Sequence, residues 1–280
     1  MILIADSGST KTEWCLINES GKPDYCSTKG INPFYQSSQE ISTSLKNDFK
    51  IDISSTTEIF FYGAGCINEE MKGVVKTALI NYFNTEKINI ESDLLGAARS
   101  LCQHSEGIVC ILGTGSNSCY YDGNLIIENV SPLGYILGDE GSGAIIGKKL
   151  LSDILKKQMS KSTIKLFYNT YNTEPNDILE NAYKKSFPNK YLATYTKFIS
   201  ENIHIEELED IVISSFNEFI ERNILQYSNI KRLPIHFTGS IAFHFRDQLT
   251  KAMNQAKLTL GYTTKTPMQG LLKYHQKDVI

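Results

Sequence analysis

The first residues whose types could do chemistry are 6–12, Asp-Ser-Gly-Ser-Thr-Lys-Thr, which follow the apolar run 1–5. An apolar strand would bring Asp6 to its end, and backbone N–H groups of the small residues could approach an anion closely. A second extended run at 12–17 and a turn signal at 18–22 predict a hairpin. A Walker P-loop and a dinucleotide fingerprint instead require a strand that enters a helix. A phosphate-binding turn and an ordinary hairpin both remain open here.

A second segment repeats this plan about a hundred residues later. The apolar run 107–112 ends in Gly113-Thr-Gly-Ser-Asn117, and an extended run at 118–121 leads to a turn at 122–124. The repetition indicates a duplicated domain, with a boundary near residues 105–107. Two such turns, one per domain, could bind a polyphosphate through backbone N–H groups. Coincidence is the competing interpretation, because glycine-containing turns are common in hairpins.

Asp93 is the clearest candidate for proton transfer. Residues 87–90 predict a strand and residues 94–102 predict a helix, so Asp93 would lie at a strand-to-helix corner. Such corners line the ligand crevice of open α/β sheets, where a carboxylate can accept a proton from a substrate hydroxyl group. Asp is also a favoured N-cap, so capping remains the structural alternative.

A glycine-rich acidic segment at 131–143 precedes a predicted helix over 144–157. We expect Asp139 or Glu140 to reach into a cleft, with free backbone N–H groups at the helix start facing the same space. Helix capping by one of these acids is the alternative. A third strand-end turn, Thr238-Gly-Ser240, follows the short strand 233–237 and precedes another helix.

The remaining segments are interpreted as scaffold. Residues 57–62 predict a strand, 69–83 a helix, and 152–231 a mostly helical region with amphipathic spacing. Residues 266–273 predict a loop that enters a final helix. His236 and His244 are assigned no chemistry, because no nucleophile lies near them in the sequence.

Composition favours a small-molecule ligand. The 280 residues carry a net charge of -3 and contain no basic block, which argues against nucleic acid or an anionic membrane as partner. No run of about 20 apolar residues and no signal peptide is present, so we expect a cytoplasmic protein. The six cysteines form no C-x-x-C pair and the five histidines are dispersed. We therefore expect reduced core cysteines and no protein-held transition metal.

Together these motifs, in this order, resemble those of the actin-like ATPase superfamily of sugar kinases. The chain is most similar to N-acetylglucosamine kinases of the BadF/BadG/BcrA/BcrD-type ATPase family, and the similarity covers nearly its whole length. The resemblance implies an α/β fold with two actin-like (ribonuclease H-like) domains and an active-site cleft between them. Residues 1–105 would form the first domain and 106–280 the second. The second domain would carry a helical insertion, and the last helix would pack back on the first.

The resemblance also implies a role for each motif. Asp93 matches the catalytic aspartate. The remaining matches are to nucleotide-binding positions (Asp6, Ser7, Gly8, Ser9, Thr10, Lys11, Thr12, Gly113, Thr114, Gly115, Thr238, Gly239, Ser240) and to sugar-binding positions (Asn32, Asn117, Gly134, Tyr135, Asp139). Animal members of the family carry a Trp in the region where this chain has Gly134-Tyr135.

The implied reaction is transfer of the γ-phosphoryl group of ATP to an amino sugar, N-acetylglucosamine at its C6 hydroxyl. Mg²⁺ would be held by Asp6 through water, with Asp139 as a further candidate, and the family suggests a homodimer. N-acetylmuramic acid and glucosamine are alternative substrates, as in cell-wall sugar salvage. An ATPase activator of a 2-hydroxyacyl-CoA dehydratase would need paired cysteines. A non-catalytic sugar sensor usually adds a DNA-binding segment, which we do not expect here.

Overall fold

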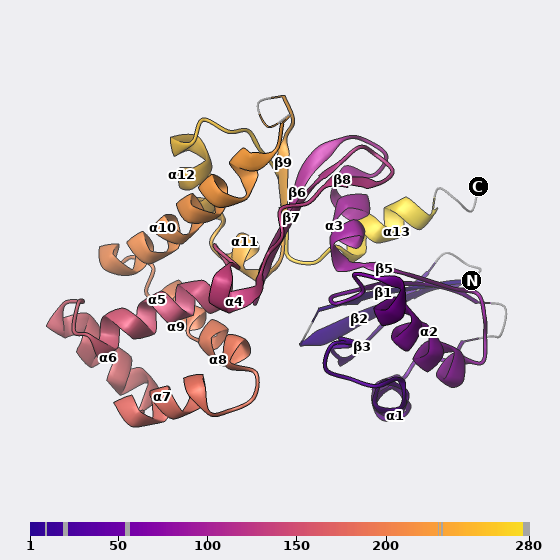
Figure 1. Ribbon diagram of the computed structural model, residues 1–280, viewed down its shortest axis with the longest axis horizontal. Coiled ribbons are helices and arrows are strands. Elements are labelled where there is room, and N and C mark those ends of the chain that lie inside the picture. Colours follow the sequence, from indigo (N-terminus) through magenta and orange to yellow (C-terminus); the bar gives the residue numbers. More distant parts are fainter. Residues whose placement is uncertain (9, 19–21, 54–56, 229, 231, 277–280) are drawn as a thin grey trace. The chain divides into compact units, whose positions relative to one another are not determined.

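The computed structural model describes residues 1–280 apart from 9, 19–21, 54–56, 229, 231 and 277–280. The chain divides into two compact units (Figure 1). Unit 1 comprises Met1–Ser105, Asp122–Ile126 and Thr266–Ile280, and unit 2 comprises Glu106–Tyr121 and Ile127–Lys265. Within the described ranges, no helix has both the length and the apolar character that crossing a bilayer requires.

Unit 1 contains one mixed five-stranded sheet with the order β3-β2-β1-β4-β5. β1 is antiparallel to β2 and parallel to β4, and β4 is parallel to β5. Its elements are β1 (Ile2–Ser7), β2 (Lys11–Ile17), β3 (Pro23–Lys29), α1 (Ser38–Asp48), β4 (Glu58–Gly63), α2 (Glu69–Phe83), β5 (Ile88–Ser92), α3 (Asp93–Cys102) and, from the end of the chain, α13 (Met268–Gln276).

The second sheet has the order β8-β7-β6-β9-β10, with β6 antiparallel to β7 and parallel to β9. Many helices lie between β8 and β9 in the chain. The elements are β6 (Gly107–Leu112), β7 (Ser116–Tyr121), β8 (Ile126–Glu128), α4 (Gly134–Leu137), α5 (Gly143–Leu155), α6 (Lys161–Tyr171), α7 (Pro175–Tyr183), α8 (Pro188–Thr194), α9 (Thr196–Glu201), α10 (Glu206–Arg222), the 3₁₀ turn η1 (Ile224–Gln226), β9 (Ile235–Thr238), α11 (Ser240–His244), α12 (Arg246–Gln255) and β10 (Leu260–Thr264).

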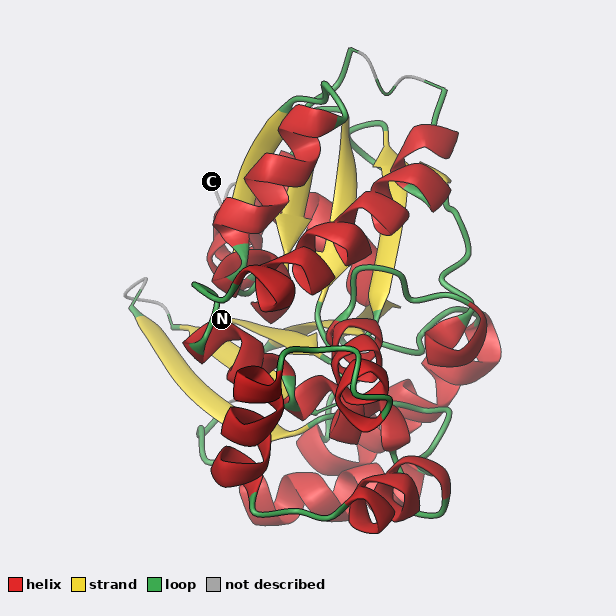
Figure 2. Ribbon diagram, turned by 90° about the vertical axis from the view of Figure 1, so that its left-hand side faces the viewer, coloured by secondary structure: helices red, strands yellow, loops and turns green. Residues whose placement is uncertain are grey.

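The two sheets repeat one plan. Each begins with an antiparallel hairpin, and the first strand of that hairpin pairs in parallel with a later strand of the same sheet. Helices connect the strands and lie against them (Figure 2). The predicted α/β class and the predicted repetition of the hairpin are therefore confirmed.

Local capping explains where the helices that flank the candidate site begin. Ser92 caps α3 and Ser142 caps α5, each by accepting a hydrogen bond from a backbone N–H of the first turn. Ser37 and Glu40 form a reciprocal capping box at the start of α1. These caps fix the start of each helix directly after the strand or turn that carries a candidate residue.

The core of unit 1 forms around Trp14, the only tryptophan in the sequence, which is fully buried. Its ring lies 5.3 Å from Phe49 and 5.8 Å from Phe83, both at edge-to-face angles. Its indole N–H donates to Thr28 Oγ1 at 2.9 Å, which satisfies its polar atom inside the core. Trp14 thereby joins the first hairpin to β3 and to the helical layer.

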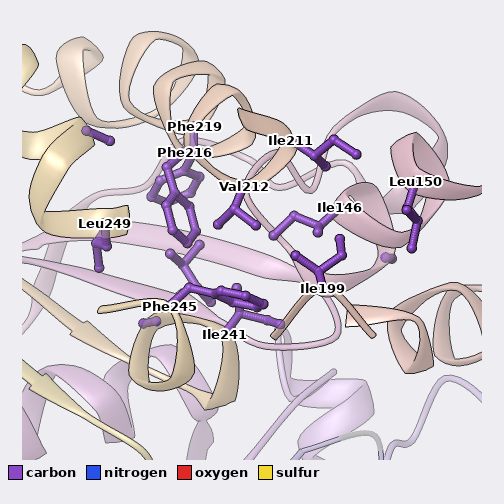
Figure 3. Close-up of a cluster of buried hydrophobic side chains, with 14 of the residues drawn as sticks. Ile146, Leu150, Ile199, Ile211, Val212, Phe216, Phe219, Ile241, Phe245 and Leu249 are labelled. Atoms are coloured by element: carbon purple, nitrogen blue, oxygen red, sulfur yellow. The ribbon is translucent and has the colours of Figure 1, made fainter. Parts of the chain in front are cut away.

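The core of unit 2 is larger and consists mainly of helix side chains packed on β6. Figure 3 shows side chains from several helices meeting in one cluster. The predicted amphipathic face of residues 211–224 supplies much of it, and this confirms the scaffold interpretation. The labelled members are Ile146, Leu150, Ile199, Ile211, Val212, Phe216, Phe219, Ile241, Phe245 and Leu249.

Candidate active site

Unit 1 brings two aspartates to the edge where its parallel strands end. Ser7 on β1 lies opposite Gly63 on β4, and Gly63 lies opposite Ser92 on β5. Asp6 and Asp93 are therefore two strand positions apart, a backbone separation of roughly 10 Å. Gly63 places no side chain between them. In open α/β sheets this edge is where ligands bind.

Burial raises the pKa values of both carboxyl groups. Burial raises the pKa of Asp6 to about 7, and the nearby carboxylates of Asp93 and Glu13 add to the rise while Lys11 opposes it. Burial also raises the pKa of Asp93 to about 6, although backbone N–H groups such as that of Leu94 lower it. Carboxyl groups that titrate near neutral pH at a strand-end edge are typical of functional sites.

Asp93 is the first residue of α3 and does not cap it. Ser92 Oγ performs the capping by accepting a hydrogen bond from the backbone N–H of Leu95 at 3.2 Å. Asp93 Oδ1 instead accepts from the backbone N–H of Leu94 at 2.9 Å. The capping interpretation of Asp93 is therefore wrong, and the Leu94 hydrogen bond orients its carboxylate at a helix start that favours negative charge.

Asp6→Asn should stabilise the metal-free, nucleotide-free protein more at pH 8 than at pH 5. The pKa of Asp6 in the folded state is about 7, against an ordinary value of 3.8. The folded protein thus keeps a proton that the unfolded chain has lost, and the free energy of unfolding falls as pH rises through this window. Asn removes that dependence. Thermal unfolding in EDTA measures it, with the exposed Asp24→Asn as control. Equal shifts in Tm at both pH values would contradict the raised pKa of Asp6.

The turn of the first hairpin separates into a buried and an exposed part. Ser7 and Thr12 are fully buried, whereas Gly8, Thr10 and Lys11 are exposed. The backbone N–H of Gly8 donates to Lys11 O at 3.0 Å and closes the turn. The exposed residues are free to meet a ligand, but the hydroxyl groups of Ser7 and Thr12 face the interior. The prediction for Ser9 lies outside the described residues.

Asn32 lies in the loop after β3 and packs against the end of β4. Its Oδ1 accepts from the backbone N–H of Phe34 at 3.0 Å. A Cβ atom at Gly65 would lie only 2.5 Å from this Oδ1, and Gly65 has a φ of +82°. Only glycine suits such a backbone and such an approach. The edge of unit 1 that carries Asp6 and Asp93 therefore also carries Asn32.

In unit 2, two glycine-containing turns follow neighbouring parallel strands. The β6–β7 turn closes through a hydrogen bond from Gly113 N to Gly115 O at 2.9 Å. Gly239, which follows β9, packs so closely on β6 that a Cβ atom would collide with the carbonyl oxygen of Leu112. Thr238 is buried and pairs its hydroxyl with that of Thr264, whereas Ser240 is exposed.

The structure assigns different positions to the two acids of the 131–143 segment. Asp139 Oδ1 accepts from the backbone N–H of Ser116 at 3.3 Å, and its carboxylate lies against Gly115. Burial raises the pKa of Asp139 to about 6. Glu140 instead pairs with Arg222 at the end of α10, with 2.9 Å between Oε1 and Nε. Asp139 is thus the acid that joins the β6–β7 turn.

The start of α5 is not an open anion site. Its first two backbone N–H groups donate to the carbonyl oxygens of Gly113 and Thr114, at 2.8 and 3.1 Å. The third donates to the Oγ of the cap Ser142. The expectation of free N–H groups at this helix start is therefore wrong, because the β6–β7 turn supplies their acceptors. These bonds instead fix that turn to α5.

The remaining predicted sugar-binding residues lie on unit 2. Asn117 is on β7, and its Oδ1 accepts from Asn129 Nδ2 at 3.0 Å. Gly134 is exposed, begins α4 and has a φ of +73°. Tyr135 is half-buried against the core of unit 2, and its carbonyl oxygen accepts from Lys148 Nζ at 3.3 Å.

Sequence reasoning missed two residues that support the candidates. Gly65 contacts Asn32 and Arg222 pairs with Glu140, both only through tertiary packing. The repeated glycines at 63 and 65, directly after a strand, were the available signal for a close approach. The Glu140–Arg222 pair joins residues far apart in the chain and left no local signal.

Among the described residues, no group of three His, Cys, Asp or Glu side chains could hold a metal ion. All six cysteines are free and five of them are buried. The expectation of unpaired core cysteines therefore fits five of the six, with Cys26 partly exposed.

Solved structures, and not family models or curated proteins, reveal the relatives of this chain. No family model and no curated protein matches the chain. A solved structure from Porphyromonas gingivalis, assigned as an N-acetylglucosamine kinase, is 44% identical with a TM-score of 0.95, covering 100% of both chains. A second protein with this assignment, from Chromobacterium violaceum, is 18% identical with a TM-score of 0.77 and 98% coverage of both chains.

A more distant structure shares the fold alone. The ROK-family glucokinase of Streptomyces griseus, solved with glucose and AMPPNP, is 12% identical with a TM-score of 0.54, and 98% of each chain is covered. The likeness extends along nearly the whole chain, as the sequence motifs predicted. With 44% identity to the Porphyromonas protein over its full length, the chain belongs to the N-acetylglucosamine kinase family of sugar kinases.

Proposed function

We propose that this protein transfers the γ-phosphoryl group of ATP to the C6 hydroxyl group of N-acetylglucosamine. The observation that carries the proposal is the position of Asp93, which is oriented by Leu94 N–H at the strand-end edge that also holds Asp6 and Asn32. The 44% identity to a protein assigned as an N-acetylglucosamine kinase supports the choice of sugar. We also propose that the chain belongs to the narrower BadF/BadG/BcrA/BcrD-type ATPase family.

Asp93 is proposed to accept the proton of the attacking hydroxyl group. A pKa raised to about 6 makes its carboxylate a stronger base than an ordinary aspartate while leaving it ionised above neutral pH. Phosphoryl transfer has a loose transition state, so alignment of the hydroxyl group matters more than forced proton removal. The hydrogen bond from Leu94 N–H fixes the orientation of this carboxylate.

The nucleotide is proposed to meet glycine-containing turns of both units. The exposed residues Gly8, Thr10 and Lys11 would contact phosphate in unit 1, and residues 113–115 would do so in unit 2. The Thr238–Ser240 turn would bind the adenosine. We further propose two actin-like domains, 1–105 and 106–280, with the helical insertion in the second and the last helix packed back on the first, which the grouping of Thr266–Ile280 with unit 1 supports.

Mg²⁺ fits the donors that unit 1 presents. They are the carboxylate oxygens of Asp6 and Asp93, whose pKa values burial raises, and a nearby cation would favour their ionised forms. The described residues supply no three-ligand cluster, which suits an ion that keeps several waters and binds chiefly to phosphate. Asp6 would hold it through water. When bound, the ion neutralises phosphate charge.

The sugar is proposed to contact residues from both units. In unit 1, Asn32 would bind a sugar hydroxyl group or the acetamido group. In unit 2, Asp139 and Asn117 would do the same, with the segment at Gly134-Tyr135 beside them. The buried position of Asp139 against the β6–β7 turn suits a carboxylate that accepts hydrogen bonds from hydroxyl groups.

A coupled ADP-release assay across sugars tests the proposal. We expect turnover with N-acetylglucosamine to exceed that with N-acetylmannosamine, glucosamine and glucose, because only the first matches the proposed hydroxyl and acetamido contacts together. N-acetylmuramic acid as the best substrate would redirect the assignment to the cell-wall sugar alternative. Sugar binding without ADP release would contradict a kinase and indicate a sensor.

We also propose that the protein acts in the cytoplasm as a homodimer. ATP as phosphoryl donor implies a cytoplasmic reaction, and the family resemblance implies a homodimer. Light scattering on the purified protein with and without N-acetylglucosamine would test the assembly.

A further inference from the structure

Ser7 belongs to the motif predicted to bind phosphate, yet its hydroxyl group is directed elsewhere. The side chain is fully buried. Its Oγ accepts a hydrogen bond from the backbone N–H of Ile31 at 3.0 Å and lies 3.1 Å from the carbonyl oxygen of the same residue. One hydroxyl group thus contacts both polar backbone atoms of a residue 24 positions away in the chain.

Thr12, at the other end of the hairpin turn, extends this contact. It is also fully buried, and its Oγ1 lies 2.7 Å from Ser7 Oγ. It donates to the carbonyl oxygen of Lys29 at 3.1 Å. The backbone N–H of Gly30 donates to Thr10 O at 3.1 Å. Consecutive residues from 29 to 31 are therefore bound to the first hairpin, two of them by hydroxyl groups.

The segment held in this way leads directly to Asn32. Its side chain packs over Gly65, and its backbone N–H donates to Gln36 Oε1 at 2.7 Å. Ile31 is buried in the apolar core of unit 1, so its side chain keeps the loop attached to the unit. The contacts of the Ser7 hydroxyl group also fix the orientation of the Ile31 backbone. That orientation sets the direction of the chain at the next residue, Asn32.

We propose that Ser7 and Thr12 are positioning residues for the sugar-binding loop and that neither hydroxyl group contacts the nucleotide. The inference rests on the proposed function, in which Asn32 contacts the sugar. It assigns a specificity role to two residues of a segment that the sequence motif allots wholly to phosphate.

The phosphate-binding turn does not depend on these hydroxyl groups for its own shape. Gly8 N–H donates to Lys11 O within the turn, and Ala64 N–H donates to Ser7 O at 2.8 Å. Both are backbone bonds that an alanine at position 7 retains. Loss of the Ser7 hydroxyl group should therefore disturb residues 29–32 more than residues 8–11.

Steady-state kinetics of Ser7→Ala separates the two possible roles. We expect the KM for N-acetylglucosamine to rise about tenfold, because a small misplacement of a binding group lowers productive binding strongly. The KM for ATP should change less than about twofold. The matched control is Ser42→Ala, which removes a hydroxyl group that is 5% exposed and donates to Ala78 O at 2.8 Å in the same unit. It should change neither KM. A rise confined to the KM for ATP in Ser7→Ala would overturn the inference.

Thr12 provides a second test that keeps the packing. Thr12→Val removes the hydroxyl group with little change of shape and should raise the KM for N-acetylglucosamine, whereas Thr12→Ser should restore it. Equal KM values for the sugar in the Val and Ser variants would overturn the role of the hydroxyl group.

Asn32→Ala distinguishes failure of the inference from failure of the proposed function. If this variant leaves the KM for N-acetylglucosamine unchanged, the assignment of Asn32 to sugar binding fails, and the inference about Ser7 and Thr12 fails with it. If Asn32→Ala raises that KM while Ser7→Ala and Thr12→Val do not, only the inference fails. A rise in all three variants, with an unchanged KM for ATP, supports both.

Discussion

Asp93→Asn is expected to lower kcat for sugar phosphorylation by about a thousandfold, within the range that general-base removal produces. The amide cannot accept the proton of the attacking hydroxyl group. Its oxygen can still accept the hydrogen bond that Asp93 Oδ1 receives from Leu94 N–H, so α3 should begin at the same residue. We therefore expect a folded protein that binds ATP normally. ADP release gives kcat, and calorimetric titration with AMPPNP gives the affinity for nucleotide.

Glu91→Gln is the matched control for this prediction. Glu91 lies on β5 two residues before Asp93, and its carboxylate pairs with Lys72 Nζ at 3.1 Å. Removal of this charge changes the field near the site while leaving the proposed base in place. Its kcat should stay within a fewfold of wild type. Near wild-type turnover in Asp93→Asn would refute the catalytic assignment, and an equal loss in both variants would attribute the effect to local charge.

Strand-end positions could be predicted from the sequence because they depend on local patterns. The apolar runs at 1–5 and 107–112, each followed by a small-residue turn, determined both hairpins. The strand-to-helix corner at Asp93 followed from a change of hydrophobic period over a few residues. The long helix α2 begins and ends where its periodicity predicted, at Glu69 and Phe83.

Hydrogen-bond partners could not be predicted, because they depend on residues that are distant in sequence. The N–H groups at the start of α5 looked available from the sequence, but the β6–β7 turn supplies acceptors about thirty residues earlier in the chain. The same limit applies to Ser7, whose motif predicts phosphate contact while its hydroxyl group binds Ile31. The different partners of Asp139 and Glu140, which are the Ser116 N–H and Arg222, also lie elsewhere in the chain.

Short elements with weak periodicity were also missed. α4 spans only Gly134–Leu137 and buries none of its residues, so no apolar face marks it in the sequence. β10 spans Leu260–Thr264 and buries none of its residues fully, and its register against β9 is irregular. Its position depends on pairing with β9, from which α11 and α12 separate it in the chain.

Gly239→Ala should have the largest effect on stability, a loss of about 3–5 kcal/mol in the free energy of unfolding. Gly239 has φ 115° and ψ 158°, a backbone region that is essentially restricted to glycine. A Cβ atom there would also collide with the backbone carbonyl of Leu112, which cannot rotate away as a flexible side chain could. Urea unfolding measures the loss, and ATP titration of any folded fraction should show weaker binding at the Thr238–Ser240 turn.

Gly134→Ala is the comparison for a positive φ without a close backbone contact. Gly134 also has a positive φ, +73°, but a Cβ atom there would meet nothing within 4 Å. We expect this variant to lose only about 1–2 kcal/mol, the cost of a left-handed backbone for an L-residue. The difference between the two variants then measures the cost that Gly239 adds through its glycine-only backbone region and its close approach to Leu112 together. Equal losses would mean that neither feature costs more than an ordinary positive φ. A much larger loss at Gly239 would mean that the adenosine turn of the proposed kinase requires glycine at position 239.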